Sequence, residues 1–207
     1  GIGVDTIDLK AATEAGIIVT NNPTYCIQEV AEHAMALMLA CARRVAFFDR
    51  QVRAGEWNVM AGKPMFRLEG STLGLLGFGN IAREVAKRGA AFGMNVIFAD
   101  PFVEEGQFDV PAKKVENDEL FREADLLSVH PPLIPQTRGM LNDDVFKVMK
   151  STAYIINCAR GPIIDTDALV RALDAGEIGG CGLDTTDPEP LPNPHPLRDR
   201  DNVIINP

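Results

Sequence analysis

The chain has 207 residues, of which 46% are hydrophobic and 24% charged, a composition that suits one large globular domain or one and a half small ones. Its formal net charge of −9 argues against a nucleic-acid-binding protein, because phosphate neutralisation needs clustered Lys and Arg side chains. The basic pairs Arg43-Arg44 and Lys113-Lys114 are interpreted as solvated surface. No apolar run has the length of a membrane span. We therefore expect neither nucleic acid nor a membrane among the partners.

The chain contains four cysteines, and none of them forms a C-x-x-C pair. Each lies inside a predicted element or at its edge, which favours buried reduced thiols over disulfides or a metal site. The three histidines, His33, His130 and His195, are too scattered to indicate zinc. Reduced thiols are typical of the cytoplasm, where we expect this protein to reside.

The first segment, residues 1–22, is predicted to contain a short helix at 6–15, closed by Gly16, and a brief buried strand at 17–20. The chain opens at Gly1 without methionine and stops at Pro207 directly after an apolar strand. Both ends look cut, and we expect a domain excised from a longer protein.

The longest predicted helix covers residues 28–48, and its apolar band is wider than one face requires. Burial on two sides, one of them a partner subunit, would explain this width. A central helix under a loop would explain it equally well. Residues 49–69 carry few periodic signals and are interpreted as an arm, with Trp57 as a packing anchor.

Residues 71–100 are predicted to form a strand, a turn, a helix and a second strand, which is followed by an acidic residue. A short apolar run at 71–76 leads into Gly77-Phe78-Gly79-Asn80-Ile81-Ala82, which has the spacing G-x-G-x-x-A. Gly77 permits a tight turn, Gly79 lets the backbone approach a pyrophosphate, and Ala82 lets the helix pack close to the sheet. The positive end of the helix dipole then stabilises the phosphates. This pattern predicts a dinucleotide-binding unit.

Asp100 ends the second strand of this unit, at 95–99. A carboxylate there can accept hydrogen bonds from the two hydroxyls of the adenine ribose and would repel a 2′-phosphate. The sequence therefore favours NAD over NADP as the cofactor.

Beyond Asp100 the alternation of helices and strands continues. Helices are predicted at 117–124, 142–149 and 165–175, and strands at 125–129, 153–157, 180–183 and 203–205. Apolar strands alternating with amphipathic helices predict an α/β fold with a Rossmann-type, doubly wound and mostly parallel sheet that has helices on both faces.

Ligands of such sheets bind beyond the carboxyl ends of the strands, so the polar side chains there are the site candidates. Arg160 could hold a carboxylate bidentately and polarise an adjacent carbonyl, as reduction of a 2-oxo acid requires. The alternative is a structural ion pair with Asp165 or Asp167, but the position of Arg160 favours function.

Asp184 ends the next strand and could hydrogen-bond the nicotinamide end of the cofactor. Glu189, held between prolines, suits the second member of a proton-transfer pair, although an ordinary surface acid is the alternative. His130 precedes two prolines at a strand end, which fits a rigid wall beside the cofactor better than proton transfer. His33 is interpreted as a core or interface histidine.

The chain resembles the D-isomer-specific 2-hydroxyacid dehydrogenases, particularly phosphoglycerate dehydrogenase-like members. The resemblance extends over nearly the whole chain and depends on the ordered segments 1–8, 30–33, 77–82, 130–133, 157–161 and 184–191. It implies an NAD-binding domain at 1–207, with a hinge-proximal segment (1–22), a long helix and dimerisation arm (23–69) and a Rossmann core (70–207). The substrate domain would be missing at both ends, and a homodimer would form through residues 28–69.

The resemblance also implies roles for single residues. Arg160 would be the substrate-binding and catalytic arginine, and Glu189 the acid paired with the catalytic histidine. Cofactor contacts are implied for Asn80 and Ile81 at the pyrophosphate, Asp100 at the ribose, Pro131, Pro132 and Thr137 in the cleft, and Cys158, Ala159, Arg160 and Asp184 near the nicotinamide.

One departure from the family pattern concerns catalysis. In the family the catalytic histidine follows the terminal strand, whereas this sequence ends at Pro207. We therefore expect NAD binding without useful turnover of a 2-hydroxy or 2-oxo acid by this segment alone. An NAD-sensing, corepressor-like binding protein and a formate- or phosphite-oxidising relative are the alternatives.

Overall fold

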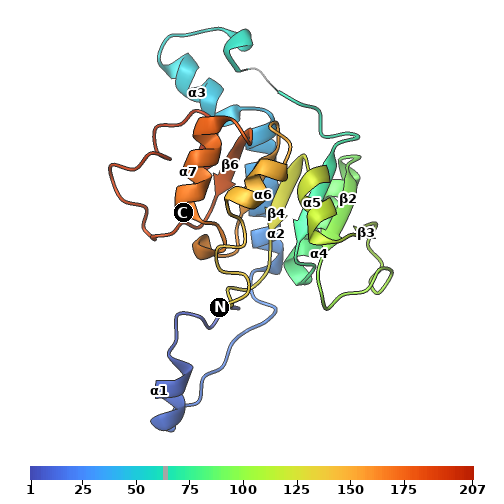
Figure 1. Ribbon diagram of the computed structural model, residues 1–207, viewed down its shortest axis with the longest axis vertical. Helices are drawn as coiled ribbons and strands as arrows, with labels where there is room; N and C mark the ends of the chain where they lie inside the picture. The colour runs from blue at the N-terminus through green and yellow to red at the C-terminus, as the bar shows by residue number, and fades with distance from the viewer. Residues whose placement is uncertain (63–64) are drawn as a thin grey trace.

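The structure, a computed structural model, describes residues 1–62 and 65–207, and a seven-stranded sheet forms its centre (Figure 1). Every pair of neighbouring strands is parallel, and the spatial order is β3-β2-β1-β4-β5-β6-β7. The strands are β1 (Thr72–Leu76), β2 (Asn95–Ala99), β3 (Lys113–Lys114), β4 (Leu126–Val129), β5 (Tyr154–Asn157), β6 (Gly180–Leu183) and β7 (Val203–Ile205). This arrangement confirms the predicted Rossmann-type α/β fold.

Helices cover both faces of the sheet. On one face α2 (Ile27–Ala42) and α4 (Asn80–Ala91) pack together, and on the other lie α5 (Asn117–Glu123), α6 (Asp143–Val148) and α7 (Thr166–Ala175). All residues of β4, β5 and β6 are buried, as expected for parallel strands covered on both sides. The short helix α1 (Leu9–Glu14) and the helix α3 (Val45–Arg53) lie at opposite ends of the molecule (Figure 1). Short 3₁₀ turns occupy Val59–Gly62 and Gly161–Ile163.

The predicted single helix at 28–48 is wrong, because the chain breaks at Arg44 between α2 and α3. Arg44 adopts a left-handed conformation with φ of 55°. Its Nη1 donates to the hydroxyl of Tyr154 over 3.3 Å, and its guanidinium lies 4.8 Å from the centre of the Phe47 ring. Arg44 is therefore half-buried rather than part of a solvated surface, and the predicted arm at 49–69 begins inside a helix.

The wide apolar band of α2 is buried within the single chain. The helix packs against α4 on one side and against β5 and β6 on another. Its buried residues are Ala31, Ala34, Met35, Leu37, Met38, Cys41 and Ala42. The band therefore fits a central helix of the domain and requires no partner subunit.

Two predictions about exposed segments are wrong. Residues 17–20 form no strand, and Ile17 and Ile18 are 62% and 88% exposed, because no sheet edge lies beside this segment to pair with it. Trp57 is 89% exposed, so it anchors no packing within this chain.

The second basic pair lies at the surface, as predicted, but Lys113 and Lys114 also form the short edge strand β3 beside β2, which was not predicted. Their ammonium groups lie 3.1 Å from Glu119 and 3.2 Å from Glu104. Charged side chains on a short edge strand discourage pairing with another sheet.

The four cysteines are free thiols, but only Cys41 and Cys181 are buried as predicted, whereas Cys26 and Cys158 are half-buried. Within the residues that the structure describes, no helix is long and apolar enough to cross a membrane. Across residues 1–62 and 65–207 there is also no group of three metal-ligating side chains.

Candidate cofactor and substrate site

The glycine-rich turn lies where the strand order reverses, between the ends of β1, β2 and β4. Gly77 has a φ of +80°, and a Cβ atom there would stand 3.0 Å from the backbone nitrogen of Pro131. Its N–H donates to the carbonyl of Ala99 over 2.8 Å. Only glycine combines this conformation with such close backbone neighbours, so Gly77 holds the turn against the segment that follows β4.

The N-terminus of α4 is open to an anion. Gly79 caps this 12-residue helix without a side-chain hydrogen bond, and its first turn contains no acid. A Cβ atom at Gly79 would meet nothing within 4 Å, so space surrounds the backbone there. The amide groups at Asn80 and Ile81 start the helix and suit a pyrophosphate. Arg83, one turn on, donates to the side chain of Asn80.

Asp100 joins the end of β2 to the glycine-rich turn. Its Oδ2 accepts from the N–H of Phe78 over 2.8 Å, and its Oδ1 accepts from the N–H of Phe102 over 2.8 Å. Phe78 itself stacks on Phe98 with 3.9 Å between ring centres. Each carboxylate oxygen has a second lone pair, so the geometry leaves acceptor capacity for hydroxyl groups.

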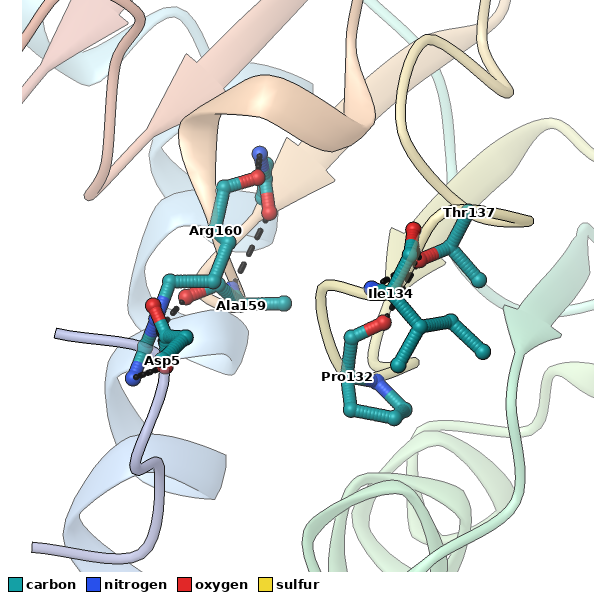
Figure 2. Close-up of polar contacts among 7 residues, drawn as sticks. Asp5, Pro132, Ile134, Thr137, Ala159 and Arg160 are labelled. Atoms are coloured by element: carbon teal, nitrogen blue, oxygen red, sulfur yellow. Dashed lines mark hydrogen bonds and ion pairs between the residues drawn. The ribbon is translucent and has the colours of Figure 1, made fainter. Parts of the chain in front are cut away.

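The segment after β4 forms a wall on the other side of the turn. Burial lowers the pKa of His130 to about 4, so its imidazole is neutral at pH 7. Beyond it, the hydroxyl of Thr137 donates to the carbonyl of Pro132 over 2.6 Å and accepts from the N–H of Ile134 over 2.9 Å. Figure 2 shows this compact turn across from Arg160.

Asn157, buried at the end of β5, shapes the next segment. Its Oδ1 accepts from the N–H of Ala159 and its Nδ2 donates to the carbonyl of Arg160, each over 3.0 Å. Burial, followed by the charge of Asp184, raises the pKa of Cys158 to about 12. The thiol is therefore neutral and unsuited to nucleophilic attack.

Arg160 forms an ion pair with a carboxylate of its own chain. Its Nε lies 3.2 and 3.0 Å from the two carboxylate oxygens of Asp5, and its Nη2 lies 3.1 Å from one of them (Figure 2). This pairing holds the pKa of Asp5 below its usual range. Asp165, one of the partners considered from the sequence, instead caps α7.

Sequence reasoning missed Asp5 as a partner of Arg160. A side chain at Gly3 would overlap the guanidinium of Arg160. The glycine two residues before the acid was therefore a signal that another group approaches this segment closely.

Asp184, at the end of β6, has a partner that was also missed. Its Oδ1 lies 3.4 Å from the Nε2 atom of His33 on α2. Burial raises the pKa of Asp184, His33 opposes this rise, and the charge of Glu189 adds to it. Glu189 is exposed and makes no hydrogen bond or ion pair with the described residues.

The loops that carry Arg160 and Glu189 lie against each other. A Cβ atom at Gly161 would overlap the backbone carbonyl of Thr186, so only glycine permits this approach. The candidate residues therefore gather at the carboxyl edge of β1, β2, β4, β5 and β6, whereas no direct contact between Arg160 and Glu189 occurs within residues 1–62 and 65–207.

Residues 35–207 match the family model described as D-isomer specific 2-hydroxyacid dehydrogenase, NAD binding domain. The chain belongs to this family. Over its full length it is 44% identical to hydroxypyruvate reductase of Thermotoga maritima and covers 67% of that protein. It is 43% identical to D-3-phosphoglycerate dehydrogenase of Methanocaldococcus jannaschii and covers 40% of it. The family resemblance and the NAD cofactor predicted from the sequence are thereby confirmed.

Solved structures of similar proteins share this fold over the whole chain. TT0316 protein from Thermus thermophilus has a TM-score of 0.91 at 42% identity, and the chain covers 66% of it. NAD-dependent formate dehydrogenase from Staphylococcus aureus, in complex with NAD, has a TM-score of 0.91 at 36% identity, with 62% covered. The D-2-hydroxyacid dehydrogenase domain described here thus spans between two fifths and two thirds of these relatives.

Proposed function

We propose that this NAD-binding domain serves an oxidoreductase that transfers a hydride between NAD(H) and a small 2-hydroxy or 2-oxo acid. The names of its relatives, hydroxypyruvate reductase and D-3-phosphoglycerate dehydrogenase, support this substrate class. The observation that carries the proposal is the bidentate grip of Arg160 on the Asp5 carboxylate at the edge where the glycine-rich turn lies. A 2-oxo acid offers the same carboxylate group.

When NAD is bound, its nicotinamide ring accepts or donates the hydride. Gly77, Gly79, Asn80 and Ile81 hold the pyrophosphate at the amino end of α4, where no side-chain cap competes. Asp100 accepts from the ribose hydroxyls. The cofactor is bounded by His130, Pro131, Pro132 and Thr137 on one side and by Cys158, Ala159 and Asp184 near the nicotinamide.

The substrate end depends on Arg160 and Glu189. Arg160 binds the substrate carboxylate and polarises the carbonyl that gains or loses the hydride, because a guanidinium offers two parallel N–H groups to oxygen. To bind there, the substrate carboxylate replaces that of Asp5. Glu189 acts through a histidine, whose pKa it raises when the two are paired.

Residues 28–69 are proposed to form the contact of a homodimer. The exposed apolar side chains of this segment support this: Val45, Val52, Trp57, Val59 and Met60. Large exposed apolar side chains close together are typical of protein interfaces.

The cofactor assignment can be tested with Asp100→Arg and isothermal titration calorimetry. We expect NAD to bind at least about tenfold more weakly, because the hydroxyl acceptor is lost, and NADP to gain affinity relative to NAD. Asp109→Arg makes the same charge change at an exposed position and should leave both affinities within about twofold. Unchanged NAD affinity in Asp100→Arg would exclude Asp100 from the ribose site.

A further inference from the structure

Helix α2 lies close against β6 because Gly182 has no side chain. A Cβ atom at Gly182 would stand 3.1 Å from the Cβ of Leu37 and 3.4 Å from the Sγ of Cys41. Alternate residues of a strand point to the same face of a sheet, so Asp184 is directed toward the same helix. His33 lies one turn before Leu37, on the same side of α2. This packing brings His33 to the end of β6.

One imidazole lies beside the carboxylate of Asp184. The Oδ1 atom of Asp184 is 3.4 Å from the Nε2 atom of His33, and the carboxylate accepts no hydrogen bond from residues 1–62 or 65–207. The backbone is fixed more firmly, because the N–H of Asp184 donates to the carbonyl of Asn157 over 3.0 Å. His33 is therefore the neighbour that can determine the direction of the carboxylate.

The imidazole has an atom available for this contact. The Nε2 atom of His33 is buried and has no hydrogen-bond partner among the described residues. A buried N–H group without an acceptor is destabilising, so a small movement of the Asp184 carboxylate toward Nε2 is favourable. Burial raises the pKa of Asp184, whereas the charge of His33 lowers it. The contact thus favours the ionised form of the carboxylate, which accepts hydrogen bonds through both oxygens.

We propose that His33 is a positioning residue for the nicotinamide ring of the cofactor. Its Nε2–H group donates to Oδ1 of Asp184 and turns Oδ2 toward the ring, where Oδ2 accepts from the NH₂ group of the carboxamide. Because the carboxamide lies on one edge of the ring, its position determines which face of the ring meets the substrate. This role of His33 rests on the proposed function, in which Asp184 lies beside the nicotinamide.

The test compares two nucleotides by isothermal titration calorimetry with the full chain. One is NAD, and the other is its analogue with an acetyl group in place of the carboxamide, which keeps the carbonyl but has no N–H group to donate. We expect His33→Leu to reduce the preference for NAD over the analogue by at least about threefold, because only NAD uses the aligned carboxylate. His33→Gln, whose amide NH₂ group can donate to Asp184, should keep the preference within about twofold of the wild type.

Two further variants separate positioning from a general effect on α2. Glu32→Leu introduces the same side chain at the neighbouring position, where Glu32 lies 3.5 Å from Arg88, and it should leave the preference unchanged. Asp184→Ala should reduce the preference as His33→Leu does, and the two changes together should cause no further loss. Binding of the analogue should change little throughout, which shows that each variant is folded.

Equal weakening of NAD and of the analogue by His33→Leu would overturn the proposal, because it would indicate a structural role alone. A further loss of preference when His33→Leu is added to Asp184→Ala would also overturn it. Equal affinities of the wild type for the two nucleotides would remove Asp184 from the nicotinamide, and with it both the proposed function of Asp184 and the role of His33. A wild-type preference that persists in His33→Leu would contradict the role of His33 alone.

Discussion

Arg160 contacts a carboxylate that lies 155 positions away in the sequence. The side chains of Arg160 and Asp5 are 39% and 28% exposed, so the pair is screened by water and exchanges readily. Because the pairing lowers the pKa of Asp5, the contact is present at neutral pH and is lost only as the pH falls below 3.8. At any higher pH, Asp5 therefore competes with any other carboxylate for the same guanidinium.

We predict that Asp5→Asn tightens binding of a 2-oxo acid to the NADH-saturated chain by about two- to fivefold, the range expected from losing an exposed competing carboxylate. Fluorescence titration with pyruvate measures this. Asp8→Asn, which removes a nearby charge at the cap of α1, is the control and should change little. Weaker binding in Asp5→Asn would mean that Asp5 orients Arg160 rather than competing for it.

His130 is predicted to make stability depend on pH. The unfolded chain binds a proton at this position below pH 6.5, whereas the folded chain binds one only below about 4. Stability therefore falls as the pH drops through this window, by about 3 kcal/mol at most.

Urea unfolding of the wild type and of His130→Leu at pH 7 and at pH 4.5 measures the effect of His130. The free energy of unfolding should fall less between pH 7 and pH 4.5 in the variant, which has no imidazole to protonate. Equal losses in the two proteins would show that the imidazole is not buried in its neutral form.

At the scale of elements, the glycine-rich turn has a specific steric requirement. Gly77→Ala combines a strained positive φ with a clash against the Pro131 backbone, and we expect it to destabilise the fold by about 2–4 kcal/mol and to weaken NAD binding. Gly106→Ala is matched in backbone conformation, with φ of +75°, but faces open space. Gly106→Ala should lower the free energy of unfolding by only about 1 kcal/mol. Similar losses in both variants, by thermal unfolding, would contradict a role for the Pro131 contact.

The elements that the sequence predicted well are those whose signals are local. The strands of the sheet other than β3 are short apolar runs, and helices α6 and α7 begin at the side-chain caps Asn142 and Asp165. The break after α2 was missed because Arg44 is held by Tyr154, a contact between residues 110 positions apart. The apolar residues at 17–20 have strand composition but no neighbouring strand, and composition alone cannot reveal that.

The candidate site shows the same difference between features that follow from local sequence signals and contacts between distant segments. The parallel sheet places the strand-end residues Asp100, His130, Arg160 and Asp184 at one edge, and this followed from the order of the elements. The partners Asp5 and His33 did not, because they come from segments outside the alternating pattern. Their contacts depend on how those segments fold back over the sheet.

At the scale of the whole molecule, the exposed side chains after α3 predict self-association. We expect the chain to be a dimer in sedimentation velocity experiments and Trp57→Ser to weaken this dimer at least about tenfold, since buried aromatic side chains dominate interfaces. Phe102→Ser removes a side chain that is equally exposed, at 88%, but lies outside residues 28–69. It should leave the dimer unchanged, and an equal effect of both variants would exclude the proposed contact.

The 16 residues of α2 extend about 24 Å, from the side of the glycine-rich turn to Arg44 at the far edge. His33 meets Asp184 near its beginning, and Arg44 follows its last turn. Packing against α4, β5 and β6 holds the helix on the sheet along its length, so the spacing between its two ends is fixed. The carboxyl edge that carries the candidate cofactor residues and the amino edge where Arg44 contacts Tyr154 are therefore joined by one continuous element.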